Sequence, residues 1–187
     1  IAIAPNKRYA AIIIENERDE DLNDGLLPQY PTGSLLIADL KGSAGSWTIR
    51  TADLSAVAAN AANGSDLEPE FVDINKKNQA VVTFQENNHI AIVDLRSGDT
   101  INEFPAGSVD LSNVDSNEED LIVLDTSITR RREPDAVSWI DNEYFATANE
   151  GDYEDASGEE GGSRGFTVFK SDGSVAYESA ESFEHLL

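Results

Sequence analysis

The sequence predicts an all-β protein, a β-propeller of which about three four-stranded blades are present. Two observations lead to this fold class. Short runs rich in β-branched and aromatic residues alternate with polar turn residues. A set of four such runs then recurs three times along the chain. Repeated four-stranded antiparallel meanders of this kind are typical of propeller blades.

The middle copy, expected at about 68–106, is the clearest. Its four runs are 68–74, 79–86, 89–95 and 100–104, and the turns between them are rich in Asn, Lys, Ser, Gly and Asp. Residues of these types stop a strand and favour a tight turn. The same order of runs is found upstream at about 1–55 and downstream at about 133–180. These ranges are the expected first, second and third blades.

Residues 107–132, between the second and third copies, are longer than an ordinary blade connection. We expect this inter-blade insertion to pack against the outside of the propeller or to cover a rim. The chain opens inside a strand-like run and has no Met, so we expect it to be an internal part of a longer precursor. Because propellers have about four to eight blades, three cannot close a ring. The remaining blades are expected from missing sequence or, less simply, from another chain.

The charge of the chain limits its partners. It has 13 Lys and Arg against 36 Asp and Glu, a net charge of −23. Such a chain repels phosphate backbones and anionic membranes, so no nucleic-acid partner is expected. It attracts divalent cations or basic partners, although solubility alone also explains much of the charge. The absence of Cys excludes disulfides and thiolate metal sites. No apolar run approaches the roughly 20 residues of a transmembrane helix.

Five glutamates are predicted to share one rim, which we call the acidic rim. In a meander, the start of the first strand and the end of the second lie on the same rim, near the central channel. Glu68 and Glu133 begin first strands, and Glu15, Glu86 and Glu150 end second strands. The last three recur at what reads as the same position in each copy. The sequence therefore predicts a cluster of carboxylates at this rim.

Two long connections leave the same rim and carry further acids. Residues 16–33 contain Asp19, Asp21 and Asp24, and residues 151–164 contain Asp152 and Asp155. Carboxylate oxygens suit Ca²⁺ or Mg²⁺, so the five glutamates are candidate ligands of Ca²⁺ or another divalent cation, with these aspartates as additional ones. The alternative is that the acids cap turns and pair with Arg or backbone amides.

Other motifs point to no specific chemistry. No segment matches a calcium-binding loop of the helix–loop–helix kind, and no Ser/His/Asp spacing supports a catalytic triad. Catalytic residues therefore stay unassigned. Arg132 and Arg164 are candidates for contacting an anion beside the acidic rim.

Five segments together resemble the choice-of-anchor I propeller proteins. They are Glu15-Asn-Glu-Arg-Asp-Glu-Asp, Glu68-Pro-Glu-Phe-Val-Asp, Gln85-Glu-Asn-Asn-His89, Arg132-Glu-Pro-Asp-Ala-Val and Ala148-Asn-Glu-Gly-Asp152. Members of this family are bacterial exported proteins, often described as alkaline-phosphatase-like. The mesenchyme-specific cell-surface glycoproteins of biomineralising animals look similar. The resemblance implies export to the periplasm, the medium or the cell surface, more blades than this chain holds, and a link to phosphate or calcium.

Three functions follow as hypotheses. The first is a surface module that binds a divalent cation, mineral or a partner through the acidic rim. The second is a metal-dependent phosphoesterase, in which the ion polarises a phosphate ester and activates water. The third is a structural spacer without a ligand.

Overall fold

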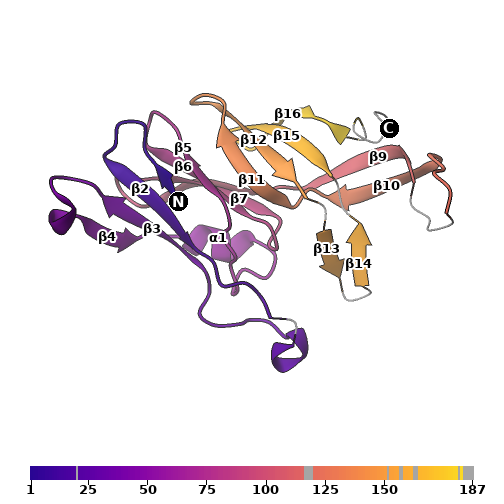
Figure 1. Cartoon of the computed structure of the whole chain (residues 1–187), viewed down its shortest axis with the longest axis horizontal. Helices are drawn as coiled ribbons and strands as arrows, with labels where there is room; N and C mark the ends of the chain where they lie inside the picture. Colours follow the sequence, from indigo (N-terminus) through magenta and orange to yellow (C-terminus); the bar gives the residue numbers. More distant parts are fainter. Residues whose placement is uncertain are drawn as a thin grey trace.

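The predicted all-β class and the three four-stranded blades are confirmed (Figure 1). The computed structural model describes residues 1–19, 21–115, 120–150, 152–155, 158–161, 164–180 and 182, with the backbone alone for 23, 152–155 and 158–161. Each blade is an antiparallel sheet whose strands follow one another in chain order, apart from a hairpin inserted in the third. Blade 1 consists of β1 (Ala2–Ile3), β2 (Tyr9–Ile14), β3 (Ser34–Asp39) and β4 (Thr48–Thr51). Blade 2 consists of β5 (Val72–Ile74), β6 (Gln79–Phe84), β7 (His89–Asp94) and β8 (Thr100–Pro105). Blade 3 consists of β11 (Pro134–Trp139), β12 (Tyr144–Asn149), β15 (Gly165–Lys170) and β16 (Val175–Glu178).

Several elements outside the twelve blade strands were not predicted. The inter-blade insertion forms a two-stranded hairpin of β9 (Ser108–Val114) and β10 (Thr126–Arg131), while the apolar residues of 121–124 are exposed. A second hairpin, β13 (Asp152–Asp155) with β14 (Gly158–Gly161), lies within the β12–β15 connection. Short helical segments are α1 (Ser55–Asn60), η1 (Leu22–Gly25) and η2 (Ala44–Ser46).

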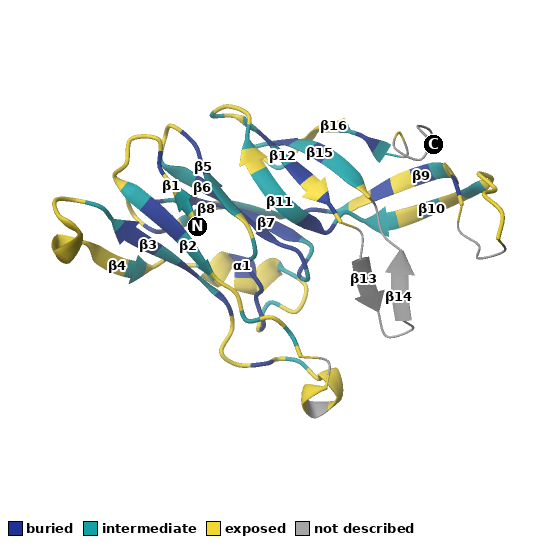
Figure 2. Cartoon of the chain, in the orientation of Figure 1, coloured by how far each residue is buried: buried dark blue, intermediate teal, exposed yellow. Residues whose placement is uncertain are grey.

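The blades pack face to face, and blade 2 lies between the other two (Figure 2). One face of blade 1, with Ala11 and Ile37, contacts the face of blade 2 that carries Val82 and Val93. The opposite face of blade 2 packs against Phe145 and Phe169 of blade 3, whose ring centroids are 5.6 Å apart. Because β6 and β7 are covered on both faces, they read as continuous apolar runs rather than as alternating ones.

Strand pairing fixes which residues of the blades are equivalent. Each second strand has six residues and begins at Tyr9, Gln79 or Tyr144. The second residue of each second strand pairs with the last residue of the first strand in the same blade. These pairs are Ile3–Ala10, Ile74–Ala80 and Trp139–Phe145. The first residue after each second strand is therefore Glu15, Gln85 and Glu150, in that order.

The expected equivalence of Glu86 with Glu15 and Glu150 is thus wrong by one residue, since Gln85 occupies that position. The same register makes Glu68 equivalent to Glu133, because each lies six residues before the last residue of its first strand.

Replacing Phe145 with Ala tests the packing between blades 2 and 3. Phe145 is fully buried among Phe104, Trp139 and Phe169, so F145A is expected to lower the free energy of unfolding by about 3–5 kcal/mol. The matched control is F71A, because Phe71 is 45% exposed and should cost less than about 1.5 kcal/mol. Urea unfolding followed by fluorescence measures both. Equal losses in the two variants would contradict the packing described here.

Candidate functional site

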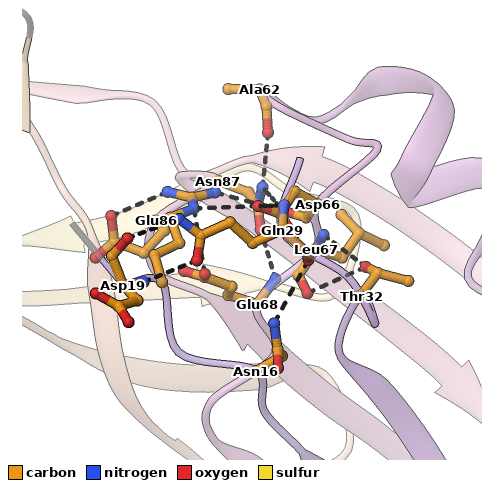
Figure 3. A network of polar contacts seen from close by, with 11 residues as sticks. Asn16, Asp19, Gln29, Thr32, Ala62, Asp66, Leu67, Glu68, Glu86 and Asn87 are labelled. Atoms are coloured by element: carbon orange, nitrogen blue, oxygen red, sulfur yellow. Dashed lines mark hydrogen bonds and ion pairs between the residues drawn. The ribbon is translucent and has the colours of Figure 1, made fainter. Parts of the chain in front are cut away.

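Arg18 lies among three carboxylates of the segment that leads into blade 2 and of the β6–β7 turn. Its Nε is 3.2 Å from Glu68 Oε1 and 3.7 Å from Asp66 Oδ2, and its Nη1 donates to Glu86 Oε2 at 3.2 Å. Glu68 and Asp66 are 2% and 0% exposed, so their charges need a partner in the fold. We call Arg18, Asp66, Glu68 and Glu86 the Arg18 cluster, and Figure 3 labels its three carboxylates.

The β2–β3 connection that carries Arg18 also contacts the segment that leads into blade 2 through Gln29 and Gly33. Gln29 donates its backbone N–H to Asp66 Oδ2 at 3.1 Å, and its side chain exchanges two hydrogen bonds with the backbone of Asp19. Gly33 donates to the carbonyl of Leu67 at 2.8 Å. A Cβ atom at Gly33 would lie 2.5 Å from Pro69 Cδ, so the close approach requires glycine. These contacts fix the position of the guanidinium.

A second group of carboxylates comes from all three blades. It consists of Glu15 after β2, Glu70 before β5, Asp135 in β11 and Glu150 after β12, and we call it the four-acid group. Burial raises the pKa of Glu70 most, and repulsion from Glu15, Asp135, Glu86 and Glu150 raises it further. In the described part of the chain, none of the four forms an ion pair with a basic side chain. Glu70 Oε2 is buried and accepts no hydrogen bond.

Burial and repulsion together perturb the acids of both groups. Burial raises the pKa of Glu68 to about 7, against the opposing effect of Arg18. Burial, then repulsion from Glu15 and the other acids, raises the pKa of Glu70 to about 8. The pKa of Asp135 is raised by burial and by Glu150, and that of Glu15 by burial and by Glu17. Among the carboxyl groups of Glu15, Glu68, Glu70 and Asp135, that of Glu70 is therefore the one whose charged form is least favourable.

The structure distributes the five predicted glutamates over three places. Glu68 and Glu86 belong to the Arg18 cluster, whereas Glu15 and Glu150 belong to the four-acid group. Glu150 also accepts a hydrogen bond of 2.7 Å from Gln85, its equivalent in blade 2. Glu133 is 2% exposed and lies where blades 2 and 3 meet, since its backbone N–H donates to Asn88 Oδ1 at 3.2 Å.

The predicted loop ligands are not gathered around these glutamates. Asp19, Asp21 and Asp24 are exposed, and Asp19 Oδ1 accepts the backbone N–H of Asp21 at 3.0 Å. Asp152 and Asp155 begin and end β13, and their side chains lie outside the described residues. Within the described part of the chain, no three Asp, Glu or His side chains are already disposed to hold a metal ion. The predicted metal ligation stays a prediction.

The two arginines proposed as anion contacts have different surroundings. Arg132 Nε donates to Glu178 at 2.8 Å, Nη1 donates to the Ala106 carbonyl at 2.7 Å, and the guanidinium lies 5.8 Å from the centre of the Phe169 ring. These contacts join the end of the insertion to blades 2 and 3. Arg164 is exposed just before β15. A role in anion contact stays a prediction for both.

Sequence reasoning missed Arg18, Asp66, Glu70 and Asp135. For two of them a signal was present: Glu68-Pro-Glu70 and Glu133-Pro-Asp135 are the same motif at equivalent positions, with an acid on either side of proline. Because successive residues of an extended chain point to opposite sides, residues two apart share a side. Both acids of each motif were therefore candidates. Arg18 had no such signal, because it lies in a long connection without a counterpart in blade 2.

Three four-stranded blades packed face to face, with carboxylates from each blade near one rim, define a β-propeller module. The chain belongs to the choice-of-anchor I domain family, whose model matches residues 1–161. Among solved structures, the chain is similar to the β-propeller domain of Myceliophteria thermophila Cps50 (Swd1). The identity is 10%, the match covers 95% of this chain and 70% of that chain, and the TM-score is 0.33. No curated protein matches the chain. Among the described residues, no helix is long and apolar enough to cross a bilayer.

The raised pKa values predict an unusual dependence of stability on pH. Between the ordinary value of 4.5 and the native values of about 7 for Glu68 and about 8 for Glu70, the folded chain holds protons that the unfolded chain has released. The free energy of unfolding should therefore fall as pH rises from about 5 to about 8 in the absence of divalent cations.

E70Q should make this decline shallower and raise the Tm at pH 8 by a few degrees, since about 1 kcal/mol corresponds to about 2–4 °C in a domain of this size. The control is E143Q, because Glu143 is exposed on the opposite rim and should leave the decline unchanged. Urea unfolding in a chelating buffer at three pH values measures the slope. A stability that rises over this range would contradict the assignment.

Proposed function

We propose that this chain is a non-enzymatic module of an exported propeller, and that its four-acid group takes up a divalent cation, Ca²⁺ in the first place. One observation carries the proposal: Glu70 has a buried, unpartnered carboxylate oxygen and is repelled by acids from the neighbouring blades. A cation among these carboxylates would replace repulsion by attraction. The chemistry of the donor set fits Ca²⁺, which takes carboxylate oxygens in a flexible geometry.

The division into two acidic groups supports the position of the ion. Arg18 already supplies a positive charge to Asp66, Glu68 and Glu86. In the part of the chain that the structure describes, no basic side chain does the same for Glu15, Glu70, Asp135 and Glu150. A cation is therefore expected at the four-acid group, where it would link blades 1, 2 and 3.

Binding at this place requires some rearrangement, since no three acids are preassembled around a point. Glu side chains have three rotatable bonds, and water molecules often complete the coordination of Ca²⁺ or Mg²⁺. A site assembled on binding is expected to be weak. We expect a Kd of about 10⁻⁴–10⁻³ M, the range of extracellular calcium modules.

Membership of the choice-of-anchor I family supports an extracytoplasmic location, which would expose the module to such cation concentrations. Nothing in the described residues favours the phosphoesterase hypothesis. Of the two histidines, His89 is buried and paired with Glu103, and His185 lies outside the described residues. The phosphoesterase hypothesis stays a prediction.

Thermal unfolding with and without Ca²⁺ tests the proposal. At a Ca²⁺ concentration 100 times the Kd, binding to the native state alone should add about 2.7 kcal/mol of stability. For a domain of this size, this corresponds to a rise in Tm of about 5–10 °C. The double variant E70Q/E150Q should lose most of this rise, although its Tm without Ca²⁺ should be higher than that of the parent chain.

E143Q is the matched control, since it removes one carboxylate from the opposite rim and should keep the full response. A Ca²⁺ response that is the same in all three proteins would place the ion elsewhere and overturn the proposed site. Phosphate release from a generic phosphate ester is measured on the same samples. Ca²⁺-dependent turnover would favour the phosphoesterase instead.

A further inference from the structure

Five exposed cationic side chains lie on the rim opposite the acidic one. Lys7 and Arg8 are on the β1–β2 turn, Lys41 is on the β3–β4 connection, and Lys76 and Lys77 are on the β5–β6 turn. In Figure 1 these turns lie on the side of the blades away from the β2–β3 connection and the β13–β14 hairpin. In a chain with a net charge of −23, this is an uneven distribution of positive charge.

These cations are not paired with neighbouring acids. Within the described residues, none of the five forms an ion pair. Two acids of the neighbouring strands have other partners: Asp39 Oδ2 is 3.3 Å from Arg50 Nε, and Asp94 Oδ2 is 2.7 Å from Arg96 Nη2. Asp141, on the β11–β12 turn, has its pKa lowered by the backbone N–H groups of Tyr144 and Glu143 and further by the charge of Lys77. The rim therefore keeps its positive charge available to a ligand.

The turns that carry the cations are held together by polar contacts. Asn6 Nδ2 donates to Asn78 Oδ1 at 2.7 Å, which joins the β1–β2 turn to the β5–β6 turn of the next blade. Asn6 Oδ1 also accepts the backbone N–H of Arg8 at 2.9 Å. The carbonyl of Arg8 accepts the N–H of Leu40 at 2.8 Å, so the β1–β2 turn is tied to the β3–β4 connection as well. The backbone around Arg8 is thus fixed on two sides.

A pocket of about 420 Å³ lies between these two connections of blade 1. It is lined by Arg8, Tyr9, Asp39, Leu40 and Lys41. Its volume lies within the range of small-molecule sites, about 300–1,000 Å³. The lining combines two cations and the Arg50-paired carboxylate of Asp39 with an aromatic ring and an aliphatic side chain. This combination fits a ligand with a negatively charged group attached to an apolar body.

We propose that this pocket binds a small organic molecule bearing an oxyanion group, which is held by Arg8 and Lys41 while its apolar body contacts Tyr9 and Leu40. A guanidinium can donate two parallel hydrogen bonds to an oxyanion, and an ammonium adds a compact charge beside it. Since Asp39 is paired with Arg50, two positive charges face the ligand. A doubly charged group therefore binds better than a singly charged one.

Titration of the full chain with phenyl phosphate, followed by ¹⁵N NMR, tests the site. The amides of residues 8, 9 and 39–41 are expected to shift, with a weaker effect of benzoate at equal concentration. R8Q and K41Q should each weaken phenyl phosphate binding at least fivefold, and both side chains are exposed, so folding should be preserved. Inorganic phosphate should bind more weakly than phenyl phosphate, because it lacks the apolar body.

K77Q is the matched control, since Lys77 is on the same rim but does not line the pocket. It should keep the affinity within about twofold. An equal loss in K77Q, R8Q and K41Q would show attraction by the rim as a whole and overturn the pocket assignment. The absence of shifts at millimolar ligand would overturn it too. E70Q should leave this binding unchanged, so the outcome is independent of the cation site proposed above.

Discussion

Arg18 carries the positive charge that allows three carboxylates to lie between the first two blades. Asp66 and Glu68 are almost fully buried there, and an uncompensated carboxylate in such a place is strongly unfavourable. The guanidinium suits this position because its planar set of donors can face several oxygens at once, as it does at Asp66, Glu68 and Glu86. Arg18 therefore fixes three segments relative to one another: the β2–β3 connection, the segment before β5 and the β6–β7 turn. The acids of the rim that pair with Arg18 thus differ from the four that do not, although Glu15 still raises the pKa of Glu68 and Glu86 that of Glu70.

The four-acid group lies just beyond the reach of that compensation. Glu70 is two residues from Glu68, and burial and neighbouring acids raise the pKa of both. At Glu68 the charge of Arg18 opposes this rise, whereas Glu70 forms no ion pair with a basic side chain in the described part of the chain. Identical residues in one short segment thus differ in charge preference because one has a cationic partner. A folded protein tolerates such repulsion where a bound ion, a proton or a partner relieves it. At neutral pH without a cation, the proton serves this purpose at Glu70.

Much of the fold was predictable from the sequence, and the reasons are local. The strands at 79–84 and 89–94 are buried on both faces, so their apolar runs stand out between the polar turns around Asn75 and Asn87. The site was less predictable. The register of the second strand could not be read from its end, because Gln85 and Glu86 are both polar. Only the pairing of β6 with β5 and β7 shows that Gln85, and not Glu86, is equivalent to Glu15 and Glu150. Arg18 could not be placed, because its contact with Glu68 spans two blades and 50 residues of sequence, and no local pattern encodes it. The hairpin of β9 and β10 was missed because β10 has Ile128 as its only apolar residue, so it does not read as a strand, although Val109, Leu111 and Val114 of β9 are buried.

The cations of blades 1 and 2 and the acids of the acidic rim lie at opposite ends of the same strands. In a four-stranded meander, the second strand has the turn from the first strand at one end and the acids of the acidic rim at the other. In blade 1, six residues separate Arg8 from Glu15, and a strand of that length spans about 20 Å. At physiological ionic strength the screening length is about 8 Å, so charges at this separation hardly influence one another through solvent. An excess of acid on one rim is therefore compatible with a locally basic surface on the other. The large negative net charge describes the molecule as a whole and does not describe the surroundings of a ligand at either rim.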